Sequence, residues 1–366
     1  MKVQHRHACK IRSLVITALV GSVLAGCNVV GPSSIRGGRL AYNEAINDTN
    51  NQQMLMMIVH NRYEERGNML MVGSVTANIR ISSGVDVQAG FGNDRDYSGN
   101  LVPFSGAFIY EENPTISYVP VTGVEYLRQL TMPLPMFLLA QMADSRPDPA
   151  TAYTMLISSV NRITNADFLF TPQQQPDPRF NRFVEIMTEL TQAHRLHWVA
   201  DAQDKQKFAL VIDHSADGNQ ENVRELLDIV GLPIPSDKEP DLIIPVSMAL
   251  DGASAGALGI TTRSVWDMVE ILSSATDVPP ADELEGVSTV YPRKGAVGKD
   301  LRIQFSQSEP ERAYVSVKHR SGWFYIDERD HATKSYFKLL GALWSSAMSS
   351  SAGATAAPVL TVPVSR

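Results

Sequence analysis

A carboxylate, an imidazole and a hydroxyl follow one another at Asp213-His214-Ser215, and these types make up the catalytic triads of many hydrolases. They come directly after residues 207–213 (KFALVID), whose apolar run predicts a buried strand, and α/β sheets bind ligands at such strand ends. Adjacent residues rarely converge as a triad, however, and the G-x-S-x-G elbow is missing. We therefore expect Ser215 to cap the next helix, and we keep Asp213 and His214 as secondary catalytic candidates.

A second group of candidates lies in residues 322–330 (GWFYIDERD), where aromatic and acidic residues are concentrated. Asp327 and Glu328 could form the carboxylate pair that acts as acid and base on a glycan. Neighbouring residues of a strand point to opposite faces, which argues against these two acting on one bond. We expect instead a strand with one buried aromatic face, followed by a turn and a capped helix.

Two histidines have a spacing that could bind a metal. His194 and His197 lie three residues apart within residues 178–198, whose apolar spacing predicts a helix, so they would share a face. No H-E-x-x-H pattern and no third ligand lie nearby, and His194 continues the apolar face that begins at Phe180. We therefore expect packed or hydrogen-bonded histidines, no metal site and no cofactor.

The first 26 residues have the pattern of a secretory signal peptide. Residues 1–12 carry four basic residues and no acid, and residues 13–24 (SLVITALVGSVL) carry no charge. The small residues Ala25 and Gly26 then precede Cys27. A transmembrane anchor is the rival interpretation, but about twelve apolar residues cover only part of a ~30 Å hydrocarbon core.

The segment Leu24-Ala25-Gly26-Cys27 resembles the lipobox of bacterial lipoproteins. The resemblance implies cleavage between Gly26 and Cys27, transfer of diacylglycerol to the Cys27 thiol and acylation of the new amino terminus. Two or three acyl chains hold a protein durably to a bilayer, whereas one does not. Asn28 follows where an Asp would, in enteric bacteria, favour the inner membrane. We therefore expect an outer-membrane lipid anchor with the protein facing the periplasm.

Composition and charge limit the classes of partner that the protein can bind. The 366 residues are 44% apolar and 19% charged, as in folded globular proteins. Loss of residues 1–26 would change the formal net charge from −7 to −11, and such an acidic chain lacks the cationic surface that nucleic acid requires. Cys9 would leave with the signal peptide and Cys27 would carry lipid, so no intramolecular disulfide is expected.

Hydrophobic spacing divides the chain into a lipidated tether (residues 27–38), a globular body (39–348) and a flexible tail (349–366). A junction near residues 200–207 is compatible with two lobes, 39–205 and 206–348. The body should be a mixed α/β or α+β fold with interleaved helices and strands. Three alternating segments, at residues 301–305, 313–317 and 323–325, predict a C-terminal antiparallel meander packed on a final helix over residues 331–348.

Further helices and strands are expected along the body. Helices are predicted at residues 123–130, 136–143, 149–162, 178–198 and 219–230, and after the capping-box pair Ser264 and Asp267. Asp48, Thr49 and Asn50 could cap a helix that carries Met54, Leu55, Ile58 and Val59 on one face. Strands are predicted within residues 68–91 and at 114–121, and residues 90–100 (GFGNDRDYSGN) should form an exposed loop.

Four segments resemble a family of uncharacterised proteobacterial lipoproteins: residues 39–61 (RLAYNEAINDTNNQQMLMMIVHN), 113–130 (NPTISYVPVTGVEYLRQL), 262–272 (TRSVWDMVEIL) and 322–340 (GWFYIDERDHATKSYFKLL). The similarity spans roughly residues 39–343. It implies an envelope location and one intact folded body. The family has no assigned activity, so the resemblance adds no catalytic residue.

These observations lead to two expected functions. The first is a lipid-anchored module that binds or scaffolds an envelope protein or polymer and is not an enzyme. The second is a hydrolase of cell-wall, glycan or ester substrates that uses Asp213 or the acids near Trp323. A concave pocket containing those acids, with raised carboxylate pKa values, would favour the hydrolase.

Overall fold

The computed structural model describes most of the body of the chain. The described residues are 40–67, 70–76, 79–87, 104–112, 115–120, 124–145, 148–165, 177–201, 207–213, 220–234, 241–249, 252, 256–289, 291, 301–352 and 360–363. Those from Gln53 onward belong to one compact unit, and those before it belong to another. The predicted signal peptide, Cys27, the tether and the loop at residues 90–100 lie outside the described residues.

A six-stranded sheet occupies the middle of the sequence, in the order β6-β5-β10-β9-β8-β7. Its strands are β5 (Ile157–Val160), β6 (Ile163–Thr164), β7 (Leu196–Ala200), β8 (Phe208–Asp213), β9 (Asp241–Ser247) and β10 (Leu258–Thr262). All neighbours are antiparallel except β9 and β10, which run parallel. Together with the helices around it, this sheet makes the fold α+β, as the mixed pattern predicts.

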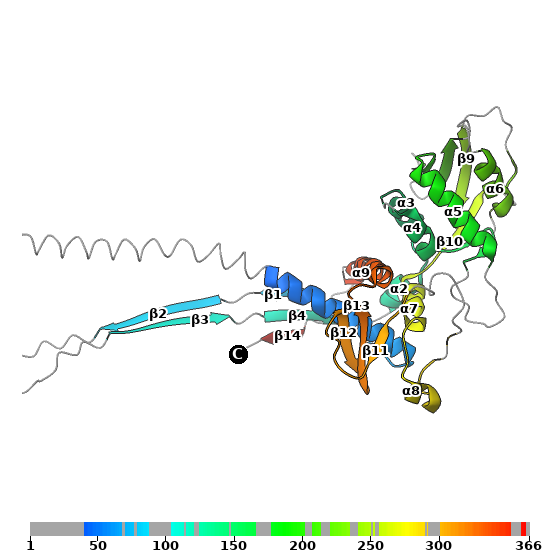
Figure 1. Cartoon of the computed structure of the whole chain (residues 1–366). Coiled ribbons are helices and arrows are strands. Elements are labelled where there is room, and N and C mark those ends of the chain that lie inside the picture. Colours follow the sequence, from blue (N-terminus) through cyan, green and yellow to red (C-terminus); the bar gives the residue numbers. More distant parts are fainter. Residues whose placement is uncertain are drawn as a thin grey trace, which may run out of the picture. The chain divides into compact units, whose positions relative to one another are not determined.

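Four helices lie beside this sheet: α3 (Met136–Ser145), α4 (Pro149–Leu156), α5 (Pro178–Gln192) and α6 (Gln220–Val230) (Figure 1). In α5, the face predicted from Phe180 to Leu190 is buried, because these side chains recur at helical spacing. Asp177 caps the helix by accepting a hydrogen bond from the backbone N–H of Arg179, at 3.0 Å. The helix therefore presents one apolar face to the core.

Strand β10 leads directly into α7 (Val265–Ser274), and this link is fully buried. The Thr262 hydroxyl donates to the Leu134 carbonyl at 2.6 Å, and the Arg263 amide donates to the Leu156 carbonyl at 2.8 Å. The predicted capping box at Ser264 and Asp267 is confirmed, with each side chain accepting from the other's backbone N–H. These hydrogen bonds fix the course of the backbone between β10 and α7.

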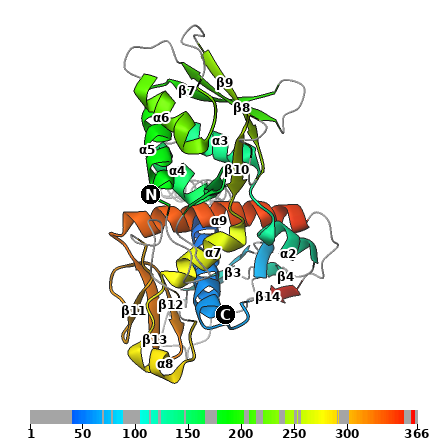
Figure 2. The same cartoon turned by 90° about the vertical axis from the view of Figure 1, so that its right-hand side faces the viewer.

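Helix α7 joins the link to the helices near the two ends of the body. It contacts α2 (Val124–Thr131) and α9 (His331–Ala352), and Figure 2 shows α7 and α9 next to each other. It also meets the helix over residues 40–62, because the Ser273 hydroxyl donates to the Ile58 carbonyl at 2.9 Å. On that helix Met54, Leu55, Ile58 and Val59 are buried, as predicted.

The C-terminal antiparallel sheet is confirmed, in the order β11-β13-β12. Its strands are β11 (Gln304–Ser306), β12 (Ala313–His319) and β13 (Gly322–Asp327). The order differs from a simple meander, because β13 lies in the middle and pairs with both β11 and β12. Ile303, just before β11, also exchanges backbone hydrogen bonds with Ala275 and Asp277, which follow α7.

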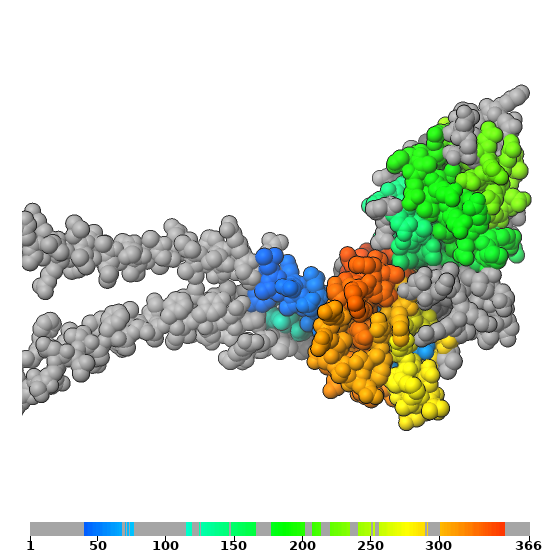
Figure 3. Space-filling view, in the orientation of Figure 1, coloured from blue at the N-terminus to red at the C-terminus, as the bar shows by residue number. Residues whose placement is uncertain are grey.

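The final helix packs on this sheet, as predicted. Tyr314 of β12 meets Phe337 of α9 edge to face, with ring centroids 6.3 Å apart. The Lys334 ammonium lies 5.0 Å from the centre of the Tyr314 ring. In the space-filling view the atoms of β12 and α9, in orange and red, adjoin (Figure 3).

The remaining strands form two smaller sheets. β1 (Leu70–Thr76), β4 (Thr115–Pro120) and β14 (Leu360–Pro363) pair in the order β1-β4-β14, and β2 (Ile79–Val87) pairs with β3 (Phe104–Glu112). A short helix, α8 (Pro280–Glu285), follows α7. The prediction of a flexible tail over residues 349–366 needs correction, because α9 extends to Ala352 and β14 pairs with β4.

Three helix boundaries differ from the predictions. The helix predicted at residues 149–162 stops at Leu156, because Asn165 bonds its final carbonyls and the next residues pair with β10. The helix predicted at residues 178–198 stops at Gln192, and β7 follows. Thr49 caps no helix start, since its hydroxyl donates back to the Ala45 carbonyl within the continuous helix over residues 40–62.

The expected junction near residues 200–207 falls between β7 and β8. These strands pair antiparallel from Leu196 opposite Ile212 to Ala200 opposite Phe208. A division at this place would separate neighbouring strands of one sheet. The structure therefore connects residues 39–205 and 206–348 through paired strands.

The capping box makes a stability prediction. Ser264→Ala removes the side-chain acceptor for the Asp267 amide at a buried helix start, so we expect a loss of about 1 kcal/mol in the free energy of unfolding. Urea denaturation would measure it. Ser308→Ala is the control at an exposed loop serine, where the change should stay within about 0.5 kcal/mol. Equal stability of the two variants would contradict this role of Ser264.

Candidate functional site

The predicted catalytic acid Asp213 is held in an ion pair. Its Oδ2 atom lies 2.5 Å from Nη1 of Arg195, and the Asp213 amide donates to the Arg195 carbonyl at 2.9 Å. A carboxylate paired with a guanidinium is stabilised in its charged form, which does not suit a general acid. His214 and Ser215 lie outside the described residues. The Asp213 side chain therefore connects the end of β8 to the segment before β7.

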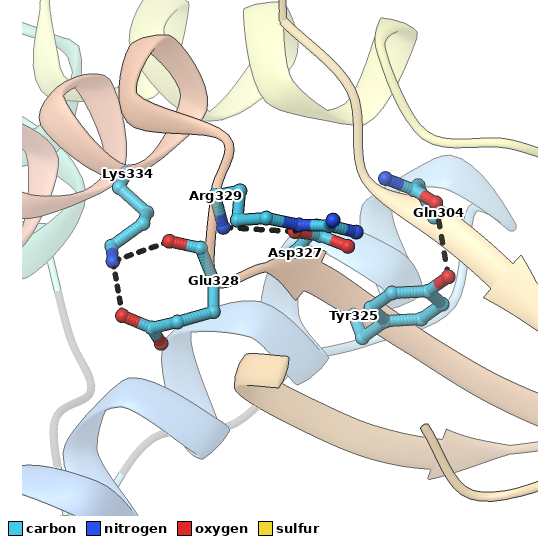
Figure 4. Close-up of polar contacts among 6 residues, drawn as sticks. All are labelled: Gln304, Tyr325, Asp327, Glu328, Arg329 and Lys334. Atoms are coloured by element: carbon cyan, nitrogen blue, oxygen red, sulfur yellow. Dashed lines mark hydrogen bonds and ion pairs between the residues drawn. The ribbon is translucent and has the colours of Figure 1, made fainter. Parts of the chain in front are cut away.

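Asp327 and Glu328 are also paired, and in different directions (Figure 4). Asp327 accepts hydrogen bonds from the backbone and side chain of Arg329, and these bonds lower the pKa of its carboxyl group. The Glu328 carboxylate lies 2.5 Å from Nζ of Lys334. The two carboxylates do not converge, in agreement with the expected strand, turn and capped helix. Asp330 is that cap, accepting from the Thr333 amide at 2.9 Å.

His194 and His197 do not lie on one helix face. Helix α5 ends at Gln192, His194 adopts a left-handed conformation (φ 55°), and the Arg195 amide returns to the Leu190 carbonyl at 2.9 Å. His197 then lies on the exposed face of β7. Both side chains are exposed, so the expectations that His194 continues the apolar helix face and that the two histidines share one helix face are wrong.

Both histidines nevertheless line the same pocket, of about 440 Å³. Its walls come from the end of α3, the start of α4 and the α5–β7 connection. The lining residues are Ala143, Asp144, Pro149, Thr191, Gln192, His194, Leu196 and His197. We call this the polar pocket, because a carboxylate, two imidazoles, a hydroxyl and an amide converge there.

A second pocket, of about 560 Å³, shares Asp144 with the first. Its lining residues are Phe137, Ala140, Gln141, Asp144, Trp198, Ala200, Asp201 and Phe208, from α3, β7 and β8. We call this the aromatic pocket. Phe137 leaves 51% of its surface exposed, although a large apolar side chain is usually buried. The two pockets therefore offer polar groups on one side of Asp144 and aromatic surface on the other.

Asp144 has the electrostatic character of a functional carboxylate. Partial burial raises the pKa of Asp144, while the nearby His197 acts to lower it, and Asp144 remains an exposed residue. A carboxyl group with a raised pKa in a concave site is a typical candidate for ligand binding or acid–base chemistry. Sequence analysis missed it, because a single Asp at the end of a short helix carries no motif.

A buried chain of hydrogen bonds connects a lining residue of one pocket to a lining residue of the other. Trp198 Nε1 donates to the Tyr153 hydroxyl at 3.3 Å, and that hydroxyl lies 3.0 Å from Oγ1 of Thr191. Thr191 uses its own hydrogen to donate to the Met187 carbonyl at 2.7 Å, so Tyr153 must donate to Thr191. Trp198 lines the aromatic pocket and Thr191 the polar pocket, so Tyr153 couples the two.

The described part of the chain holds one group of histidines and carboxylates at metal-binding separations. It consists of His60, Glu65 and His319, and does not include His194 or His197. No helix among the described residues combines the length and apolar character needed to cross a membrane.

The buried chain predicts the effect of removing the Tyr153 hydroxyl. Tyr153→Phe leaves Trp198 Nε1 without its acceptor, so we expect a loss of about 1–3 kcal/mol in unfolding free energy and a shift in tryptophan fluorescence. Tyr325→Phe is the control, because the Tyr325 hydroxyl donates a hydrogen bond to the side chain of Gln304 and this bond is only partly buried. A Tyr153→Phe variant with the stability of the original chain would contradict the chain of bonds.

Comparison with known proteins returned no relatives: no family model, no curated protein and no solved structure matches this chain. The resemblance to uncharacterised lipoproteins stays an expectation from the sequence. The function must therefore be argued from the residues of the two pockets and from the pattern of the first residues of the chain.

Proposed function

We propose that this protein is a lipid-anchored envelope protein that faces the periplasm and binds an envelope polymer at the paired pockets around Asp144. The observation that carries the proposal is the sharing of Asp144 between a polar and an aromatic pocket. The anchor is Cys27, in the lipobox-like segment, and the outer membrane is the proposed location.

The chemistry of the pockets fits a glycan strand better than a small apolar ligand. A sugar ring presents hydroxyl groups at its edge and C–H groups on its faces. Asp144 and His197 can exchange hydrogen bonds with the hydroxyls, and the exposed Phe137 ring offers a flat surface for the C–H faces. Both pockets are open, which suits a chain that continues past the site.

The acidic character of the chain limits the class of glycan. With a net charge of −11 after loss of residues 1–26, the protein would repel a strongly anionic polymer. A neutral or amine-bearing glycan is favoured, because the Asp144 carboxylate can pair with an ammonium group or accept from hydroxyls. We therefore name neutral and partly deacetylated amino-sugar strands as the ligand class.

Binding can be tested with oligosaccharides. Asp144→Asn and Phe137→Ala should each weaken binding of N-acetylglucosamine and glucosamine oligomers at least tenfold, about 1.4 kcal/mol, in calorimetric titrations. Leu284→Ala is the matched control, because Leu284 is an exposed apolar residue on α8 and outside both pockets. Equal affinity of all three variants would contradict the site.

The Asp144→Asn variant also distinguishes the loss of a ligand contact from a loss of folding stability. The pKa of Asp144 is raised above its ordinary value of 3.8, so its charge disfavours the folded state once the pH exceeds the folded pKa, and this cost is absent below pH 3.8. Asp144→Asn removes the cost, so its melting temperature at pH 7 should not fall. A large fall would indicate a structural role.

A hydrolase is the second candidate, supported by one observation. Asp144 has a raised pKa, and Asp201 lines the same aromatic pocket, so two carboxylates border one site. An enzyme should convert the oligomers to shorter products, and Asp144→Asn should abolish turnover while keeping affinity. If Asp144→Asn loses affinity for the oligomers and no shorter products form, the result supports a binding protein rather than a hydrolase.

The anchor has its own test. Cys27→Ser removes the thiol that would accept diacylglycerol, so we expect no palmitate incorporation, an uncleaved precursor and loss from the outer-membrane fraction. Metabolic labelling and membrane fractionation would measure these outcomes. Cys9→Ser is the control, because Cys9 lies within the proposed signal peptide and should leave processing unchanged. Palmitate labelling that persists in Cys27→Ser would contradict the anchor.

A further inference from the structure

A second constellation lies away from the pockets, where the end of the helix over residues 40–62 meets the C-terminal sheet. His60, Glu65 and His319 each place a potential ligand atom within 4.8 Å of the other two. All three side chains are partly buried, and none of these residues lines either pocket. Two imidazoles and a carboxylate are a frequent set of protein ligands for zinc.

The backbone around the cluster holds the ligands in place. The helix ends with Glu64 in a left-handed conformation (φ 55°), and the Glu65 amide donates to the His60 carbonyl at 2.8 Å. This turn brings Glu65 back beside His60. Arg320, next to His319, is left-handed as well (φ 51°). Residues other than glycine rarely adopt this backbone conformation.

His319 is placed by the tight turn between β12 and β13, where it pairs with Gly322. A Cβ atom on Gly322 would lie 2.4 Å from the Ser306 carbonyl oxygen, so only glycine allows β11 to pack this closely. The His319 ring packs against Tyr63 and Phe324, with ring centroids 5.3 and 6.2 Å away. The imidazole therefore has little freedom to turn away from Glu65.

The distances between the ligand atoms of these three side chains are close to those expected around a bound zinc ion. Oε2 of Glu65 lies 3.3 Å from Nε2 of His319 and 3.9 Å from Nε2 of His60. Zinc bonds of ~2.0–2.2 Å in a tetrahedral arrangement separate ligand atoms by roughly 3.3–3.5 Å. The other carboxylate oxygen, Oε1, faces Nη2 of Arg320 at 3.4 Å. Glu65 thus directs one oxygen to both imidazoles and the other to an orienting guanidinium.

Simple ion pairing does not explain this arrangement well. Within the described structure, the buried atoms His319 Nε2 and His60 Nδ1 have no hydrogen-bond partner. A bound metal ion would give an imidazole nitrogen the partner that it lacks here.

We propose that His60, Glu65 and His319 form a zinc-binding site that fastens the helix over residues 40–62 to the C-terminal sheet. Nitrogen and carboxylate ligands in a tetrahedral set suit Zn²⁺, with a water as the fourth ligand. Tyr63 packs beside the His319 ring, and the Arg320 guanidinium lies 4.8 Å from the centre of the Tyr63 ring. Zinc binding would join residues 60 and 319 directly.

The test uses the full chain in detergent, treated with a chelator and then titrated with ZnCl₂ in a calorimeter. We expect one equivalent of zinc with Kd of about 1 μM or tighter, and a rise in melting temperature with zinc concentration. Glu65→Gln and His319→Gln should each weaken binding at least 100-fold, because each removes a ligand. His331→Gln, at an exposed histidine that starts α9, should bind as the original chain does.

Two further measurements make the result decisive. Circular dichroism without zinc checks that the variants fold, and Glu65→Gln changes the most exposed ligand if His319→Gln unfolds. Substituting Co²⁺ should give the strong visible absorption of a tetrahedral site, and Glu65→Gln should lose it. Zinc affinity unchanged in folded Glu65→Gln, or a Kd above about 100 μM for the original chain, would overturn the proposal.

Discussion

The buried link between β10 and α7 is the constraint on which most of the structure depends. A backbone that passes through a core must satisfy its N–H and C=O groups there. Here Arg263 exchanges backbone hydrogen bonds with Leu134 on one side and Leu156 on the other, while Ser264 and Asp267 close the helix start. One short segment thus ties the six-stranded sheet to the helical core.

Both proposed sites depend on elements that this link holds. Leu134, bonded to Thr262 and Arg263, comes just before α3, and α3 carries Phe137 and Asp144 into the pockets. On the other side, Ser273 of α7 bonds the Ile58 carbonyl, and Asn61 donates to Ser273 at 3.0 Å. These bonds hold the turn of helix that carries His60. The binding pockets and the proposed zinc site are separate in chemistry but share one support.

The carboxylates divide into two groups according to their neighbours. Asp213, Asp327 and Glu328 each pair with a cation from a nearby part of the chain. Partial burial raises the pKa of Asp144, and the nearby His197 acts to lower it. Glu65 is shared between two imidazoles and a guanidinium. Acidic residues that stand out in the sequence are thus structural, and the candidates for function were inconspicuous.

The sequence by itself determined the elements whose signals are local. The apolar faces of α5 and α6, the capping box at Ser264 and the hairpin of β12 and β13 follow from periodicity and capping, which act within a few residues. The segment around Cys27 is also a local signal, and it stays a prediction.

Tertiary structure decided what depends on distant partners. Residues 157–160 and 196–198 looked helical by spacing, but pairing with β10 and β8 makes them parts of strands and moves His194 and His197 off the helix. The strand order β11-β13-β12 also departs from a simple meander, because β13 pairs with both of its neighbours. The pocket around Asp144 and the approach of His319 to His60 and Glu65 join residues far apart in the chain, and no local pattern records such contacts.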